Sequence, residues 1–103
     1  MKYLTFLLLK VFLLSNFVMA ETISTKSKIL KNASYCTKDS RTQICKELVF
    51  EIEKFQLVVF DQKRFKCQSS LLGLQTEIIE AYYLNNFSNE SISLMIPYVI
   101  KNC

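Results

Sequence analysis

The chain has 103 residues, which is enough for one small domain. Gly and Pro occur once each and half of the residues are hydrophobic, which excludes a linker-like or disordered chain. No His is present, so imidazole metal sites and Ser–His or Cys–His catalysis are excluded. The formal net charge is +4, but two of the lysines precede residue 21. The remainder carries 11 basic and 9 acidic residues, a balance too even to indicate nucleic-acid binding.

Residues 1–20 have the pattern of a secretory signal peptide. A short positive segment, Met1-Lys2-Tyr3, precedes a mostly apolar stretch that ends at Ala20. We predict cleavage after Ala20, which leaves one domain over residues 21–103. Lys10 interrupts the apolar stretch and therefore argues against the alternative, an uncleaved membrane anchor. No second apolar stretch is long enough to span a bilayer, so no membrane contact is expected after cleavage.

Four cysteines lie in this domain: Cys36, Cys45, Cys67 and Cys103. An even number of cysteines in a short exported chain predicts disulfides and an oxidising compartment. Zinc binding is disfavoured because there is no C-x-x-C pair and no His, and redox catalysis also requires a closely spaced pair. Four cysteines allow three pairings, and their spacing alone does not choose between them.

Hydrophobic periodicity predicts four helices. The first lies over residues 25–36 and the second, which has the strongest pattern, over residues 41–60, with Asp39 or Ser40 as its cap. Residues 61–70 are predicted to be a loop, so that Ser69 or Ser70 caps a third helix over residues 71–85. The predicted inner positions of these three helices are Ile29, Leu30, Ala33, Cys36, Ile44, Leu48, Val49, Ile52, Phe55, Val59, Leu74, Ile78, Ile79, Ala81 and Tyr82.

The fourth predicted helix begins after a cap at Ser88 or Asn89. Its inner positions are Ile92, Met95, Ile96, Val99, Ile100 and Cys103. Pro97 is expected to kink or restart this helix because its nitrogen cannot donate a hydrogen bond. The predicted fold class is therefore all-α, a small disulfide-stapled four-helix bundle. Antiparallel neighbours bring the end of one helix beside the start of the next, which favours the pairs Cys36–Cys45 and Cys67–Cys103.

Catalytic patterns are absent from the sequence. Glu77 and Glu80 are three residues apart, but a solvated helix surface explains them better than a catalytic pair. We therefore expect a binding protein rather than an enzyme, with no cofactor and no metal. Asn32, Asn86 and Asn89 fit the glycosylation sequon, which matters only in a eukaryotic secreted protein; chance in an Asn- and Ser-rich surface is the other reading.

Two segments are candidates for contact with a protein partner. Residues 61–66 offer Arg64 and Phe65, in a basic cluster that suits an acidic partner or an anionic surface. Residues 83–89 offer Tyr83, Asn86 and Phe87 and are slightly favoured. The alternative reading is that Phe65 and Phe87 fold back and cover the ends of the core.

The order of these features resembles the Rap/Tai-type periplasmic immunity proteins, which protect bacteria from type VI secretion amidase toxins. The resemblance rests on Ala33-Ser34-Tyr35-Cys36, Ile44-Cys45, Phe65-Lys66-Cys67, Leu74-Gln75, Tyr83-Leu84 and the final Cys103. This sequence departs from the family in lacking its glycine after the second cysteine and its proline after the third. The resemblance implies a periplasmic protein that binds a cognate amidase toxin and occludes its active-site cleft. Homodimerisation is a further expectation, and a periplasmic chaperone or a secreted helical effector are the alternative functions.

Overall fold

The computed structural model describes residues 24–39, 42–84 and 89–103. The predicted signal peptide, with its cleavage site, and the candidate residues Asn86 and Phe87 lie outside the described residues. The described part is helical: a helix over residues 24–38, then α2 (Gln43–Asp61), α3 (Phe65–Tyr83) and α4 (Asn89–Asn102). The prediction of a small all-α bundle is confirmed.

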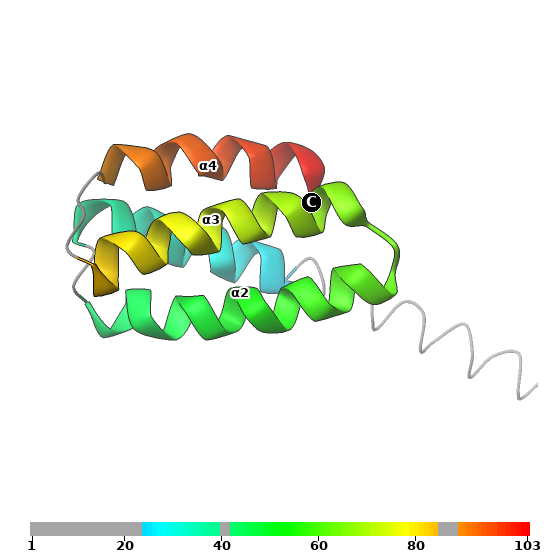
Figure 1. Cartoon of the computed structure of the whole chain (residues 1–103), viewed down its shortest axis with the longest axis horizontal. Coiled ribbons are helices and arrows are strands. Elements are labelled where there is room, and N and C mark those ends of the chain that lie inside the picture. Colours follow the sequence, from blue (N-terminus) through cyan, green and yellow to red (C-terminus); the bar gives the residue numbers. More distant parts are fainter. Residues whose placement is uncertain (1–23, 40–41, 85–88) are drawn as a thin grey trace, which may run out of the picture.

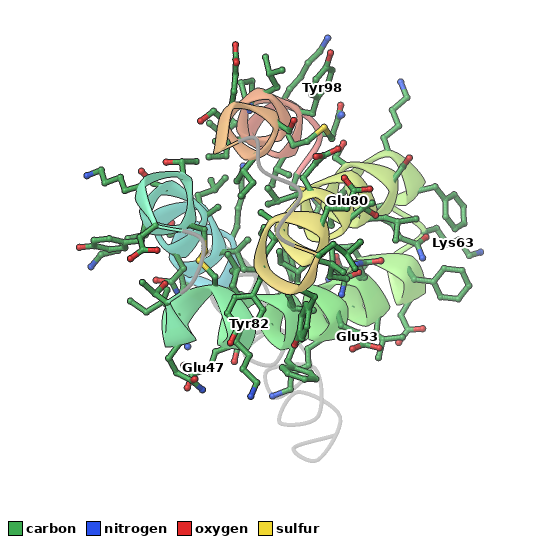
Figure 2. All side chains as sticks on the ribbon, turned by 60° about the vertical axis from the view of Figure 1, so that its left-hand side comes forward. Glu47, Glu53, Lys63, Glu80, Tyr82 and Tyr98 are labelled. Carbon is green, nitrogen blue, oxygen red and sulfur yellow. A yellow bond between two sulfur atoms is a disulfide. The ribbon has the colours of Figure 1, made fainter. Side chains whose placement is uncertain are left out.

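The four helices lie side by side with alternating directions (Figure 1). In the oblique view of Figure 2, α4 lies above and α2 below, and α3 lies between them and packs against both. The helix over residues 24–38 lies on the opposite side from α3. Each helix therefore buries one stripe and leaves its outer face to solvent.

The core follows the predicted stripes closely. Its fully buried large side chains come from all four helices: Ile29, Leu48, Ile52, Phe55, Val59, Leu71, Leu74, Ile78, Ile92 and Val99. Leu30, Ile79, Tyr82, Met95 and Ile96 pack against this core while partly exposed. The predicted burial is wrong for two residues: Ile44 is 39% exposed and Ile100 is 55% exposed. Each lies next to a fully buried residue, Cys45 and Val99 respectively, so each borders the buried stripe on the outer side of its helix.

The predicted loop over residues 61–70 is also wrong, because α3 begins at Phe65. The connection takes three residues. Lys63 adopts a positive φ of 59°, the backbone N–H of Lys63 donates to Phe60 O at 2.9 Å, and that of Arg64 donates to Val59 O at 2.9 Å. This pair of bonds is the Schellman arrangement that ends a helix abruptly, usually with glycine at the left-handed position. Ser70 lies inside α3 and donates to Lys66 O at 2.9 Å, so it does not act as a cap.

Two further local predictions are corrected. The N-cap of α2 is Thr42, whose hydroxyl donates to Asp39 O and to Cys45 Sγ, each at 3.3 Å; it makes no cap bond to the helix N–H groups. Asp39 is therefore not the cap, and Ser40 lies outside the described residues. α4 runs as one helix through Pro97, so no restart occurs. Pro97 lies on the exposed side of α4, where water can replace the backbone donor that proline lacks.

The structure joins Cys36 to Cys45 and Cys67 to Cys103, and it contains no free cysteine. Both predicted pairs are confirmed. The first bond links two consecutive helices, and its cysteines are nine positions apart in the sequence. The second spans 36 residues and links the start of α3 to the end of α4. The two bonds lie at opposite ends of the bundle and fix the positions of all four helices.

Candidate partner-binding surface

The α2–α3 turn presents an exposed aromatic pair. Phe60, in the last turn of α2, and Phe65, the first residue of α3, are 51% and 57% exposed. Their rings meet edge to face with centroids 6.0 Å apart. The predicted alternative, in which Phe65 folds back on the core, is therefore wrong. Each ring supports the other, so this apolar surface is held in place without being buried.

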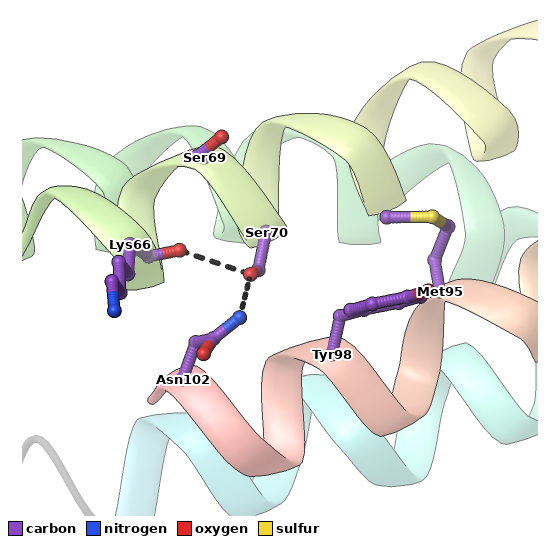
Figure 3. A pocket seen from close by; sticks show the side chains of 6 residues that line it. All are labelled: Lys66, Ser69, Ser70, Met95, Tyr98 and Asn102. Atoms are coloured by element: carbon purple, nitrogen blue, oxygen red, sulfur yellow. Dashed lines mark hydrogen bonds between the residues drawn. The ribbon is translucent and has the colours of Figure 1, made fainter.

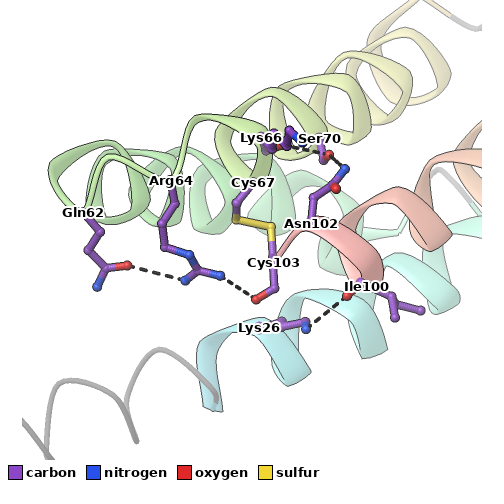
Figure 4. The surroundings of a disulfide bond; sticks show 9 residues. All are labelled: Lys26, Gln62, Arg64, Lys66, Cys67, Ser70, Ile100, Asn102 and Cys103. Carbon is purple, nitrogen blue, oxygen red and sulfur yellow. Dashed lines mark hydrogen bonds between the residues drawn. A yellow bond between two sulfur atoms is a disulfide. The ribbon is translucent and has the colours of Figure 1, made fainter.

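Arg64 differs from Phe65 although it is its neighbour in sequence. Its Nη2 donates to the main-chain oxygen of Cys103 at 2.6 Å, and its Nη1 lies 3.5 Å from Gln62 Oε1 (Figure 4). The guanidinium thus ties the α2–α3 turn to the last residue after α4, beside the Cys67–Cys103 bond. Arg64 therefore helps to position this end of the bundle, and its side chain is only partly exposed.

Further polar contacts hold the same end. Asn102 Nδ2 donates to Ser70 Oγ at 2.7 Å, which links α4 to α3. Lys26 Nζ donates to Ile100 O at 3.4 Å, which links the helix over residues 24–38 to α4. Two helices and the α2–α3 turn are therefore joined to α4 or to its end around one disulfide (Figure 4).

Cations gather at this end. Lys63, Arg64 and Lys66 lie in or next to the turn, and Lys26 and Lys101 lie on the helix ends beside it. Asp61, in the last turn of α2, is the carboxylate closest to the turn in sequence. We call this set, with Phe60 and Phe65, the basic end. Its combination of exposed aromatic rings and cations suits an acidic protein surface.

The second predicted segment lies at the other end of α3. The ring of Tyr83, 51% exposed, meets that of Tyr82 edge to face at 4.7 Å, and Leu84 is 66% exposed. Phe65 and Tyr83 are the first and last residues of α3, about 27 Å apart at the rise of an α-helix. The structure therefore does not bring the predicted partner-binding residues together. Arg64 and Phe65 form one surface, and Tyr83 belongs to another.

Two shallow hollows accompany these surfaces. A groove of about 450 Å³ between α3 and α4 is lined by Lys66, Ser69, Ser70, Met95, Tyr98 and Asn102 (Figure 3). Its inner polar groups already bond to each other, since Asn102 donates to Ser70 and Ser70 donates to Lys66 O. A smaller hollow of about 280 Å³ lies on the helix over residues 24–38 and is lined by Lys31, Ser34, Tyr35 and Lys38. Neither hollow holds a buried polar group aimed at a ligand.

The described residues contain no cluster of Cys, Asp and Glu that could hold a metal ion. Glu77 and Glu80 lie partly buried on α3, and no third carboxylate or cysteine among the described residues completes a metal-binding group with them. Of the described helices, none combines the length and the apolar character needed to cross a bilayer. This part of the chain is a disulfide-bonded helical scaffold that carries exposed side chains.

No protein-family model, no curated protein and no solved structure matches the chain.

Sequence reasoning missed two exposed aromatic residues of α2, Phe60 and Phe50. The periodicity predicts Phe60 as the last residue of a helix and indicates no contact for it, although its ring pairs with that of Phe65. Phe50 is 53% exposed on the outer face. The signal was present in the pattern, since neither residue falls on the stripe that contains Leu48, Ile52, Phe55 and Val59.

Proposed function

We propose that this protein is a periplasmic immunity protein that binds a peptidoglycan amidase toxin and occludes its active-site cleft. The family assignment derives from the resemblance in the cysteine-bearing segments. The observation that carries the mode of action is the rigid basic end, where Phe60 and Phe65 project from a three-residue turn. Inhibition then needs no chemistry from the inhibitor, because a side chain seated in the cleft excludes the substrate.

Rigidity favours this mode of action because binding costs less when the contacting residues are already ordered. The turn is fixed on one side by its own backbone bonds and on the other by Arg64 and the Cys67–Cys103 bond. The surrounding cations would favour a cleft with an acidic rim and accelerate association. Two disulfides are also compatible with an oxidising compartment such as the periplasm.

The test asks first whether a neighbouring gene encodes a secreted peptidoglycan amidase, and then uses that enzyme. Calorimetry with the disulfide-bonded protein should give a stoichiometric complex, and peptidoglycan hydrolysis should stop at equimolar inhibitor. Phe65→Ala should weaken binding by about 2 kcal/mol without lowering the melting temperature, since the ring is exposed. Leu94→Ala on α4, where Leu94 is 63% exposed, is the matched control and should leave affinity unchanged.

A variant in the second predicted segment, residues 83–89, tells the two ends of α3 apart in the same binding assay. If Tyr83→Ala weakens binding and Phe65→Ala does not, the contact lies at the other end of α3 and the role of the basic end is refuted. If the wild-type protein binds the amidase without slowing hydrolysis, occlusion is refuted. The immunity assignment itself fails if the neighbouring enzyme is neither bound nor inhibited.

A periplasmic chaperone or accessory protein is the second candidate. The observation that favours it is the large apolar exposure on every described helix, including Tyr35, Leu57, Leu72 and Leu94. A chaperone would bind several unfolded envelope proteins and suppress their aggregation, whereas an immunity protein would bind one folded enzyme. Light scattering of an aggregating client in the presence of this protein separates the two functions.

A further inference from the structure

The helix over residues 24–38 has the most one-sided charge of the described helices. It contains four lysines and no carboxylate, whereas α2, α3 and α4 together contain four lysines and seven carboxylates. Lys26 is engaged at the end of α4, because its Nζ donates to Ile100 O. The other three lysines, Lys28, Lys31 and Lys38, are exposed. One side of the bundle is therefore cationic, although the charges of the domain nearly balance.

The exposed face of this helix contains few kinds of side chain. Ile29, Ala33 and Cys36 bury the opposite face in the core. On the exposed face, the three lysines and Tyr35 are interspersed with the serines Ser24, Ser27 and Ser34. A serine side chain is short, so the lysines and the tyrosine extend furthest from the helix. A flat surface of negative charge can therefore approach this face without meeting a carboxylate.

The lysines and the tyrosine form a single stripe. Lys28, Lys31, Tyr35 and Lys38 follow one another at intervals of three or four residues, and the stripe is about 15 Å long. The ring of Tyr35 is 47% exposed, with Lys38 Nζ 6.0 Å from its centre. The hollow of about 280 Å³ lies on this stripe and is lined by Lys31, Ser34, Tyr35 and Lys38. Lys28 and Lys31 repel each other at their spacing, so the stripe favours a partner that supplies negative charge along its length.

We propose that this stripe, the lysine face, binds the headgroups of an anionic phospholipid bilayer, with the helix parallel to the membrane surface. A bilayer presents its phosphates in a plane, so all three lysines of a straight helix reach them at once. A folded acidic protein would instead need a groove shaped to the helix. Tyrosine favours the boundary between water and hydrocarbon, which is the level that Tyr35 reaches between the lysines.

The contact is peripheral and electrostatic. It requires no apolar stretch that spans a bilayer, and in that respect it extends the expectation drawn from the sequence. A lysine close to an anionic bilayer strengthens binding about fivefold, so three lysines give about a hundredfold. Salt screens this attraction, which makes the binding reversible. Phe60 and Phe65 take no part in it, so the proposal does not depend on the proposed function.

The test uses the disulfide-bonded protein, purified after export, and vesicles that contain phosphatidylglycerol and phosphatidylcholine. The protein should sediment with these vesicles at low salt, be released at high salt, and not bind vesicles of phosphatidylcholine alone. Lys31→Gln with Lys38→Gln should weaken binding about twentyfold. The matched control, Lys66→Gln with Lys101→Gln, removes the same charge from the basic end and should weaken it no more than about twofold. Circular dichroism confirms that both variants are folded.

Tryptophan fluorescence locates the contact, because the chain contains no tryptophan. The emission of Tyr35→Trp should shift to the blue when the anionic vesicles are added. The emission of Tyr98→Trp should not shift, since Tyr98 is 56% exposed on the α3 side of α4.

Four outcomes overturn the proposal. The first is a wild-type protein that does not bind the anionic vesicles, and the second is equal binding to phosphatidylcholine alone. The third is a larger loss in the control pair than in Lys31→Gln with Lys38→Gln, which would place the contact at the basic end. The fourth is binding to soluble polyglutamate as tight as to vesicles of equal charge, which would assign the lysine face to an acidic protein.

Discussion

Each end of the bundle contains a disulfide, but the two bonds differ in how much of the fold they connect. Cys36–Cys45 closes the turn between consecutive helices, and its surroundings are local: Thr42 bonds to Asp39 O and to Cys45 Sγ. Cys67–Cys103 joins segments 36 residues apart and is surrounded by bonds from Arg64, Asn102 and Lys26 to other elements. The first bond closes one helical hairpin. The second lies where the α2–α3 turn, α3, α4 and the helix over residues 24–38 are joined, and we call this end the junction. A rigid projecting turn is found at the junction.

Removal of a disulfide should lower the free energy of unfolding more than any other change. The two losses should show which end of the bundle contributes more to stability. Cys67→Ser with Cys103→Ser should cost about 4 kcal/mol of unfolding free energy, and Cys36→Ser with Cys45→Ser about 3 kcal/mol, because the longer loop restricts the unfolded chain more. Denaturant unfolding of both double variants measures the difference. If the short bond proves the more important, the distinction between hairpin and junction is wrong.

Arg64→Ala should be the next largest change. The bond from Arg64 to the main-chain oxygen of Cys103 is short and charge-assisted, so its loss should cost about 2 kcal/mol. The exposed neighbour Lys66 provides the control, since Lys66→Ala should change stability by less than about 0.5 kcal/mol. Melting curves of both variants, with the disulfides intact, make the comparison. Equal stability of the two variants would show that Arg64 is not part of the junction.

Lys63→Gly should stabilise the protein modestly. Lys63 holds a positive φ of 59° in the α2–α3 turn, where a Cβ is unfavourable. Glycine removes this cost but makes the unfolded chain more flexible, so the expected net gain is about 0.5–1 kcal/mol. Lys63→Ala retains the Cβ and should give no gain. A loss of stability in Lys63→Gly would mean that the lysine side chain contributes to the turn in its own right.

The smallest effects are expected at Ile44 and Ile100, one near each end. Both fall on predicted inner stripes, and both are substantially exposed. Ile44→Ala and Ile100→Ala should each cost less than about 1 kcal/mol, against about 3 kcal/mol for Ile52→Ala in the core. Urea unfolding measures all three. A cost near that of Ile52 at either position would show that this isoleucine belongs to the core despite its exposure.

Periodicity predicted most of the interior because the stripes of α2 and α3 depend only on the helical repeat and on the chemistry of each side chain. It failed at Ile44 and Ile100, which border the buried stripes, because the width of a buried stripe depends on how the neighbouring helices pack against it. It also failed at residues 61–70, because Ser69 and Ser70 looked like cap residues while the actual stop signal is Lys63 in a conformation that sequence does not reveal. Of the candidate site, the aromatic character of Phe65 was predictable and its pairing with Phe60 was not.

The sequence by itself determined that the chain is helical, which faces of its helices are apolar, and that its four cysteines pair across two helical hairpins. These properties follow from local periodicity and chain order. Tertiary structure alone decided that Arg64 bonds to Cys103, that Asn102 bonds to Ser70, and that no other helix covers Phe60 and Phe65. Each of these depends on the packing of segments distant in sequence, and no local pattern of residues encodes how such segments meet.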